Sequence, residues 1–539
     1  MKFPAFVALA ISCCWGIVAR AATLPTATIS AGTLVGISTS LPSSNVTVNK
    51  FLGIPYAAAP VDQLRFAMPQ APKPWSGEFL NASSFQAACF QMGATDPLPV
   101  PQSEDCLYIN VFAPSTPAPE SGRTVLVWIH GGALKTGTAA WSFYDGSSFA
   151  GNQDVVFVSL NYRLNAFGLP NAPALPLEES NLAFYDQRLA LNWIKDNIAS
   201  FGGDPAKVTV FGQSSGSTSV SRLVSTMRDN APFRAAIMQS GVYDYGYESG
   251  SPGLVGETDA WDYLVEELGC RQNTSSRAVG DELACMQNVD ALAIQDVVDG
   301  NSNLVLPGKN DNITQYAYPE YERREGRVAH VPILLGHTLN DASLFTDSSY
   351  TTLDKYIAAE PNLAPVQDEI AAAYPVGNGT GSYASQWEAN AASRTDDLFG
   401  CPISRVAKAT TELGLPVWRY LFNATFPDNE NPGYGVYHGS ELKLVFGTYN
   451  ASTATAEEKA LSKTMQTAWA DFAKDPWGAG PGWTRMNPGN RSGDYAVAAL
   501  GSVDKNPVGA SVISSDSIDG NCKIYASSYE AGQGGVAWW

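Results

Sequence analysis

Short runs of consecutive hydrophobic residues recur along this chain, and polar or glycine-containing segments separate them. Near-continuous hydrophobicity is typical of β-strands that are covered on both faces, as in a mostly parallel sheet. We expect such strands at residues 124–129, 155–160, 208–211, 235–239, 331–335 and 417–422.

Longer segments between these runs have a helical pattern, most clearly residues 181–198 and 460–474. Strands that alternate with helices predict an α/β fold, in which helices flank a central, mostly parallel sheet. Ligands of such sheets bind beyond the carboxyl ends of the strands. We therefore look for functional side chains just after residues 129, 211 and 335.

A serine between two glycines follows the strand expected at residues 208–211. The sequence there is Gly212-Gln213-Ser214-Ser215-Gly216, and a segment compatible with a helix comes next. A strand, a G-x-S-x-G turn and a helix in this order form a nucleophile elbow. The glycines are needed because the sharp turn strains its central residue and leaves no room for neighbouring Cβ atoms. Ser214 is therefore the candidate nucleophile.

Residues 201–216 as a whole resemble the active-serine signature of the type-B carboxylesterases, the cholinesterase-like branch of the α/β-hydrolases. Residues 104–110 are similar to a second signature of that family, and further similarities run through residues 51–57, 161–163 and 181–205. The resemblance implies an α/β-hydrolase fold in a fungal-type secreted member of the family. It also implies hydrolysis of carboxylic esters through a Ser-His-Asp triad and an acyl-enzyme intermediate.

The serine needs a base, and the base needs an acid that holds its tautomer. In α/β-hydrolases the acid and then the histidine follow the serine along the chain. Only His438 lies well downstream of both, and residues 435–447 are similar to the family's histidine loop. Residues 336–345 resemble the acid loop and place Asp341 where the family usually has glutamate, with Asp347 as the alternative. Because aspartate is one methylene shorter, one of the two loops has to lie closer to the other.

The other three histidines are expected to have no direct chemical role. We expect His130 to support the glycine turn that it precedes, His330 to open a buried strand, and His337 to line or flank the pocket.

The turn Gly131-Gly132-Ala133, which follows the first expected strand, is the candidate oxyanion turn. Glycines there let backbone N–H groups approach a tetrahedral intermediate, and a further donor is the N–H of the residue after the nucleophile. The resemblance implies Gly132, Ala133 and Ser215 as donors, with Ala133 in place of a glycine and Ser215 in place of an alanine. Ala133 and Leu134 are also expected to add bulk beside the turn.

The resemblance further implies two ion pairs that tie loops together beneath the site. These are Arg65 with Glu104 and Arg163 with Asp186. The arginine side chain suits such a buried brace because its planar fork matches a carboxylate at two points.

Of the eight cysteines, Cys13 and Cys14 lie in the N-terminal segment, and the six that remain permit 15 pairings. The residues alone do not choose among these pairings. By resemblance, the pairs are Cys89 with Cys106, Cys270 with Cys285, and Cys401 with Cys522. A zinc site is the competing use, but no C-x-x-C or H-x-x-x-H spacing occurs. We expect neither a metal nor a cofactor.

Residues 1–21 combine a basic start, an apolar stretch and the small-residue pattern Ala19-Arg20-Ala21. This is typical of a secretory signal peptide cleaved before Ala22. A membrane anchor is the alternative, but the apolar stretch is short for a span of about 20 residues.

Residues 22–539 contain no linker, repeat or low-complexity block, so we expect a single domain there. N-glycosylation sequons, which fit a secreted surface, occur at Asn45, Asn81, Asn273, Asn312, Asn378, Asn423, Asn450 and Asn490.

The net charge of −19 at pH 7 disfavours nucleic acid and anionic lipid as partners. We expect a small-molecule ester as the partner, with no stable membrane insertion. No tryptophan lies between Cys89 and Cys106, where cholinesterase-like relatives hold a quaternary ammonium by cation–π attraction. The lipases of the family have a longer lid in this place.

These features predict an extracellular esterase for short- to medium-chain or aryl esters. One alternative reuses the triad on a lactone or ester intermediate of secondary metabolism, as a lactonase, transesterase or cyclase. A lipase and a non-catalytic adhesion homologue are further alternatives, but the adhesion homologue conflicts with the presence of Ser214, Asp341 and His438.

Overall fold

The computed structural model describes residues 24–41, 46–75, 77, 79–93, 97–243, 259–271, 279–301, 304, 306–427, 429–487, 495–502, 506–527 and 529. The expected signal peptide and the sequons at Asn45, Asn273 and Asn490 lie outside these residues.

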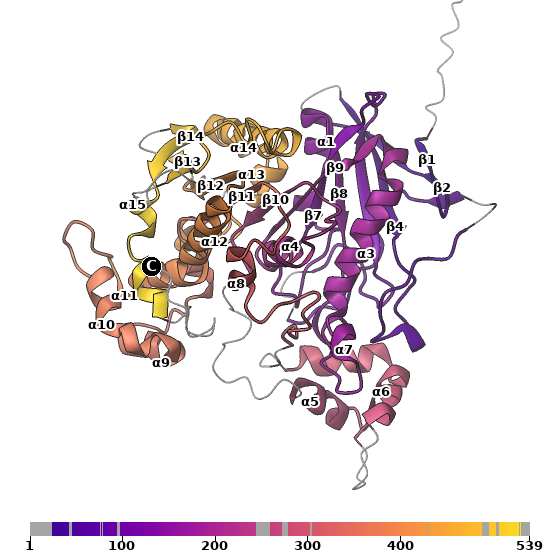
Figure 1. The fold of residues 1–539 in the computed structure, drawn as a ribbon, viewed down its shortest axis with the longest axis horizontal. Helices are drawn as coiled ribbons and strands as arrows, with labels where there is room; N and C mark the ends of the chain where they lie inside the picture. The colour runs from indigo at the N-terminus through magenta and orange to yellow at the C-terminus, as the bar shows by residue number, and fades with distance from the viewer. Residues whose placement is uncertain are drawn as a thin grey trace, which may run out of the picture.

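A large twisted sheet runs through the centre of the molecule (Figure 1). Its strands, within the described residues, are β3 (Ile37–Ser40), β4 (Thr47–Pro55), β6 (Tyr108–Pro114), β7 (Arg123–Ile129), β8 (Val156–Leu160), β9 (Gly203–Gln213), β10 (Ala235–Gln239), β11 (Ile333–Thr338), β12 (Val417–Phe422), β13 (Ala496–Ser502) and β14 (Asn506–Ser514). Their order across the sheet is β14-β13-β12-β11-β10-β9-β7-β8-β6-β4-β3. All neighbours from β13 to β8 pair in parallel, whereas β14 at one edge and β6, β4 and β3 at the other pair antiparallel. A second, small sheet consists of β1 (Thr26–Ile29), β2 (Gly32–Val35) and β5 (Phe79–Asn81).

Helices cover both faces of the central sheet (Figure 1). One face carries α3 (Leu182–Asn197), α4 (Ser215–Thr226), α8 (Pro319–Arg324) and α12 (Cys401–Glu412), and the other carries α1 (Ser147–Gln153), α13 (Leu442–Phe446) and α14 (Ala456–Lys474). Towards the outside lie α5 (Asp259–Glu267), α6 (Val279–Asn288) and α7 (Ala291–Asp299), and, near the C-terminus, α9 (Leu353–Ala359), α10 (Gln367–Ala373) and α11 (Gln386–Thr395). The short helices are α2 (Asn165–Gly168) and α15 (Asp516–Asp519). No helix in the described ranges has the length and apolar character needed to cross a bilayer.

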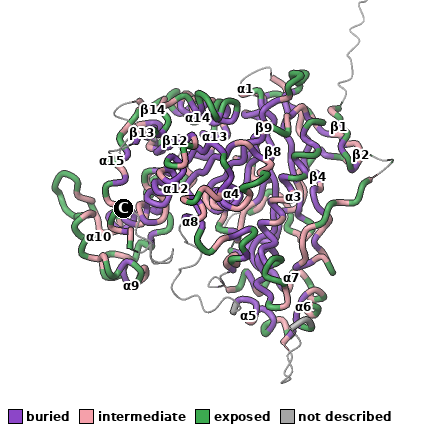
Figure 2. Tube along the Cα trace, in the orientation of Figure 1, coloured by how far each residue is buried: buried purple, intermediate pink, exposed green. Residues whose placement is uncertain are grey.

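Strand β7 shows why the strands are continuous hydrophobic runs. Val125 and Val127 belong to the core beneath α3 and α4, whereas Leu126 and Trp128 belong to the core beneath α1 and α14. Figure 2 shows the central strands of the sheet buried, whereas the outer helices α9 and α10 have both exposed and buried residues. Because both faces of the sheet are covered, no position in the strand has to be polar.

All six expected strands are present, and those expected at residues 235–239 and 417–422 coincide with β10 and β12. The other four strands, β7, β8, β9 and β11, differ from the expectation at one or both ends. Strand β11 begins at Ile333, because Pro332 before it has no N–H to donate to the sheet. His330 therefore does not open the strand; it is exposed, and its Nε2 lies 3.0 Å from the carbonyl oxygen of Gly326.

The second expected helix begins earlier than its hydrophobic pattern indicates. Helix α14 starts at Ala456, and the Thr455 hydroxyl accepts a hydrogen bond from the Glu458 N–H at 3.1 Å. A threonine that precedes a glutamate by three residues is a helix-capping signal.

Candidate active site

Ser214 lies at the sharp turn between β9 and α4, at the carboxyl end of the parallel strands. Its φ of +58° and ψ of −130° are strained for a residue with a side chain. A Cβ added to Gly216 would lie 2.1 Å from the Ile129 carbonyl oxygen, and one added to Gly212 would lie 2.5 Å from the backbone of Gly216. The Ser214 N–H donates to the Gln239 carbonyl at 2.9 Å, which fixes the turn to β10. The turn at Ser214 therefore has the strained backbone and the close packing that a nucleophile elbow requires.

Asp341 and His438 are in contact although they are 97 positions apart. Asp341 Oδ1 forms a hydrogen bond with His438 Nδ1, and Asp341 Oδ2 accepts the Thr338 N–H at 3.0 Å. Asp341 is fully buried. Burial alone would raise the pKa of its carboxyl, but the adjacent His438 imidazole holds that pKa below its ordinary value. The shorter aspartate arm thus reaches the histidine and stays ionised.

Asn340 explains how the two loops come close enough. Its N–H donates to the Val436 carbonyl, and its Oδ1 accepts the Val436 N–H, both at 3.0 Å. Ser343 Oγ adds a bond of 2.8 Å to the Tyr434 carbonyl. The acid loop and the histidine loop are therefore joined directly.

Asp347, the alternative acid, lies elsewhere. Its side chain is exposed and accepts the N–H of Ser349 at 2.7 Å. The structure therefore brings Asp341, and not Asp347, to His438.

The histidine loop also packs against the nucleophile elbow. A Cβ added to Gly439 would lie 3.5 Å from Nε2 of Gln213, the residue before Ser214. The rings of Phe345 and Phe399 pack against the His438 imidazole at centroid distances of 4.9 and 5.1 Å. His438 Nε2 is buried and has no hydrogen-bond partner within the described part of the chain. A buried nitrogen without a partner is suited to accept a proton from a hydroxyl that approaches it.

The candidate oxyanion turn has a strained backbone. Gly132, Ala133 and Leu134 have φ values of +114°, +57° and +58°. The N–H groups of Gly132, Ala133 and Ser215 donate to no acceptor in the described ranges. A Cβ added to Gly131 would lie 3.0 Å from Ser214 Cβ, so the turn sits directly beside the serine. The Leu134 side chain is buried in the core beneath α3 and α4.

His130 and His337 are buried, and burial lowers the pKa of each to about 4. Both are therefore neutral near pH 7. His130 Nδ1 lies 2.9 Å from the Gly131 carbonyl oxygen, and its ring stacks on Tyr162 at 4.5 Å, so it supports the turn as expected. His337 flanks the acid loop and does not face solvent.

A buried carboxyl group beneath the site was missed by the sequence reasoning. Glu441 Oε1 accepts the Gln239 amide at 3.0 Å, and Gln239 Oε1 in turn accepts the Trp469 indole N–H at 3.0 Å. Burial, together with the charge of Asp341, raises the pKa of Glu441 to about 7. Only its position three residues after His438 could have indicated it.

Both implied ion pairs form, and each is bidentate and buried. Arg65 contacts Glu104 at 2.5 and 2.7 Å, and Arg163 contacts Asp186 at 2.8 and 2.7 Å.

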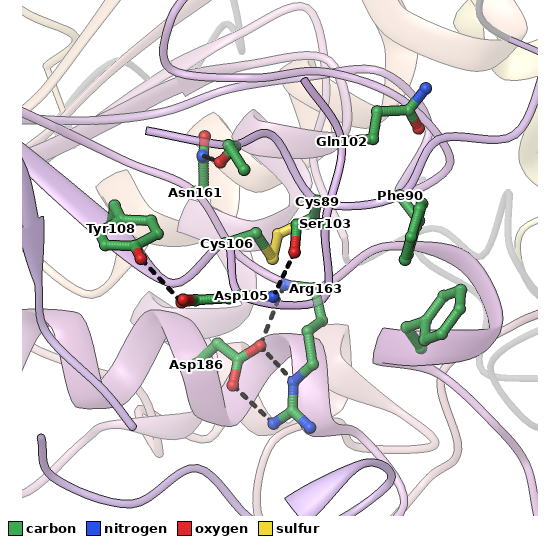
Figure 3. The surroundings of a disulfide bond; sticks show 12 residues. Cys89, Phe90, Gln102, Ser103, Asp105, Cys106, Tyr108, Asn161, Arg163 and Asp186 are labelled. Atoms are coloured by element: carbon green, nitrogen blue, oxygen red, sulfur yellow. Dashed lines mark hydrogen bonds and ion pairs between the residues drawn. A yellow bond between two sulfur atoms is a disulfide. The ribbon is translucent and has the colours of Figure 1, made fainter. Parts of the chain in front are cut away.

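The disulfides join Cys89 to Cys106, Cys270 to Cys285 and Cys401 to Cys522, the pairs implied by the resemblance. Figure 3 shows the first disulfide beside the Arg163–Asp186 pair. Among the described residues, no group of three or more His, Cys, Asp or Glu side chains could hold a metal ion.

The fold and the strand–serine–helix turn define an α/β-hydrolase. The family model described as the carboxylesterase family matches residues 23–493. The chain belongs to the carboxylesterase family.

Characterised relatives span most of the chain. It is 32% identical over 502 residues to an acetylcholinesterase of Bungarus fasciatus, covering 83% of this chain and 80% of that protein. It is 32% identical over 456 residues to a para-nitrobenzyl esterase of Bacillus subtilis, covering 79% and 86%. It is also 30% identical over 517 residues to a carboxylesterase 1C of Rattus norvegicus, covering 89% and 91%. A solved structure titled PNB esterase matches with a TM-score of 0.74 at 30% identity, covering 93% of this chain and all of the other.

Proposed function

We propose that the protein is a serine carboxylesterase, in which Ser214 attacks the ester carbonyl, His438 moves the proton and Asp341 orients and stabilises the imidazolium. The observation that carries this proposal is the contact of His438 with the fully buried Asp341, next to the strained Ser214 elbow. The backbone N–H groups of Gly132, Ala133 and Ser215, which donate to no acceptor among the described residues, would stabilise the oxyanion.

Ser214→Ala tests the assignment. Because nucleophile and base act as a unit, kcat on p-nitrophenyl acetate should fall on the order of a millionfold, with thermal stability unchanged. A serine-directed phosphonate should label Ser214 in the wild-type protein and leave the variant unlabelled. Activity of the variant within tenfold of the wild type would exclude Ser214 as the nucleophile.

The cavity beside the oxyanion turn supports neutral esters as substrates. It has a volume of about 190 Å³, and the described residues that line it carry no charge at neutral pH, among them Gln91, Leu98, Trp141, Tyr144 and Gln213. Since one relative is named an acetylcholinesterase, a cationic ester is the competing class. Among the described residues of this lining, no carboxylate would compensate a cation for the loss of its hydration.

Acetylcholine and its isosteric neutral analogue 3,3-dimethylbutyl acetate separate these classes, because they differ in charge and hardly in shape. We expect the neutral ester to have the higher kcat/KM after correction for the rates of alkaline hydrolysis. A preference for acetylcholine would contradict the proposal.

On p-nitrophenyl esters of increasing acyl length, we expect short- to medium-chain acyl groups to be preferred. We expect no rise in rate at the onset of emulsion formation, since such a rise marks a lipase.

We further propose that the protein is secreted. Three disulfides fit an oxidising compartment. The sequons at Asn81, Asn312, Asn378 and Asn450 are exposed, and Asn423 is half-buried. Mass spectrometry of the protein from culture medium, before and after enzymatic deglycosylation, would reveal the N-terminus and the modified asparagines. An N-terminus at Met1 or a cell-bound protein would contradict secretion.

A further inference from the structure

The loop of residues 131–137, which contains the oxyanion turn, holds an unusual amount of backbone strain. Three consecutive residues, Gly132, Ala133 and Leu134, have positive φ, and so does Gly137 at +113°. Left-handed backbone is unfavourable for alanine and leucine, so contacts from outside the loop have to stabilise it. The relevant contacts come from two side chains, Gln91 and Ser215.

The Gln91 carboxamide holds the far end of the loop. Its Nε2 donates to the Gly137 carbonyl at 3.0 Å, and its Oε1 accepts the Gly137 N–H at 2.5 Å. Nε2 also donates to the Cys89 carbonyl at 2.6 Å, which ties the clamp to the disulfide-bonded segment. Gln91 is only 1% exposed, and both ends of its amide bond to backbone. Although Gln91 also lines the cavity, its amide is engaged with backbone groups and is therefore placed to orient the loop.

Gly137, which Gln91 fixes, packs against the residues at the start of the oxyanion turn. A Cβ added to Gly137 would lie 2.3 Å from His130 Nδ1 and 2.4 Å from the Gly131 carbonyl oxygen. The Gly137 backbone thus lies directly against the residues that start the turn. A shift of Gly137 would move the N–H groups of Gly132 and Ala133 with it.

Ser215 holds the middle of the loop. Its Oγ accepts the Leu134 N–H at 3.2 Å, while the Leu134 carbonyl accepts the N–H of Asn165 at 2.8 Å. The residue whose own N–H is an expected oxyanion donor therefore also fixes, through its side chain, the loop that carries the other two donors. An alanine at this position would lack the hydroxyl.

We propose that the side chains of Gln91 and Ser215 are positioning residues, which hold the 131–137 loop so that its N–H groups converge on the oxyanion. This inference rests on the proposed esterase function. Donor position matters most when negative charge has developed on the substrate oxygen, so loss of the clamp lowers kcat and leaves KM nearly unchanged.

The test compares Gln91→Ala with Gln102→Ala as the matched control. The Gln102 side chain accepts the backbone N–H of Gln91 at 2.8 Å and makes no contact with Gly137. Removal of one oxyanion donor typically costs about 100- to 1000-fold, and displacement of the donors should cost less. We expect Gln91→Ala to lower kcat about 10- to 100-fold with KM within about threefold, and Gln102→Ala to match the wild type.

A trifluoromethyl ketone, which forms a tetrahedral oxyanion adduct with a serine, adds a second readout. Its affinity for Gln91→Ala should fall by the same factor as kcat/KM, which a general loss of stability in a folded variant would not produce. Unchanged kcat in folded Gln91→Ala, or an equal loss in Gln102→Ala, overturns the proposal.

If Gln91→Ala does not fold, variants of Ser215 test the proposal instead. Ser215→Ala should lower kcat several-fold, and Ser215→Thr, which keeps the hydroxyl, should restore it. Equal kcat in the wild type, Ser215→Ala and Ser215→Thr overturns the proposal. A wild-type protein that neither hydrolyses esters nor reacts with a phosphonate contradicts the proposed function instead, so the two failures are distinguishable.

Discussion

Asp341 and Asp347 form a matched pair, because they lie in one segment and only Asp341 contacts His438. The perturbation is aspartate to asparagine at each position, which removes a charge and keeps the size. In Asp341→Asn the amide would donate to His438 Nδ1, so the histidine would carry its proton on Nε2. The imidazole could then not accept the serine proton.

The position of Asp341 in the structure allows the loss of kcat in Asp341→Asn to be estimated. Asp341 is fully buried, and a unit charge about 4 Å from an imidazolium is worth about 4 kcal/mol at an effective dielectric constant of about 20. That energy corresponds to about a thousandfold in rate. The wrong tautomer adds to the loss, so kcat should fall between about a thousandfold and ten-thousandfold. Asp347→Asn should leave kcat unchanged.

Steady-state kinetics on p-nitrophenyl acetate, with circular dichroism and thermal unfolding as folding controls, measures this difference. Asp341→Glu keeps the carboxylate and should retain more activity than Asp341→Asn. If folded Asp341→Asn stays within tenfold of the wild type, or if Asp347→Asn loses the activity instead, the acid has been assigned to the wrong residue.

Three further predictions concern stability. Burial raises the pKa of Asp397 to about 7, so its folded form holds a proton that the unfolded chain loses near pH 4; the free energy of unfolding should fall as the pH rises from about 4 to about 7. Urea unfolding across this range checks the sign, and Asp397→Asn should reduce the slope. Arg163→Met leaves the buried Asp186 carboxylate unpaired and should cost about 3–5 kcal/mol in the same assay; a cost below about 1 kcal/mol would mean that the pair is not a structural brace. Replacement of both Cys89 and Cys106 by alanine opens a loop with a sequence separation of 17 and should cost about 3 kcal/mol, whereas an unchanged denaturation midpoint would contradict a stabilising role.

Local patterns in the sequence were sufficient for the parallel strands from β12 to β8 and for the serine elbow, whereas the parallel strand β13 was not predicted. Strands β10 and β12 are fully buried and mostly apolar because helices cover both faces of the sheet, although β10 ends with Gln239 and β12 contains Arg419. The elbow at Ser214 is readable because glycines are required where a Cβ would meet neighbouring backbone. Edge strands β3 and β14 were not predicted, since their half-exposed residues mix polar and apolar side chains without a continuous run.

The tertiary structure alone decided which groups meet across long separations. Residues 341 and 347 are both aspartates in one segment, and nothing in their local pattern distinguishes them. What separates them is the pairing of Asn340 with Val436, which brings the acid loop to the histidine loop. The disulfide between Cys401 and Cys522, 121 positions apart, is another such contact. Periodicity and turn chemistry act over a few residues, whereas these contacts depend on where whole strands and loops end in space.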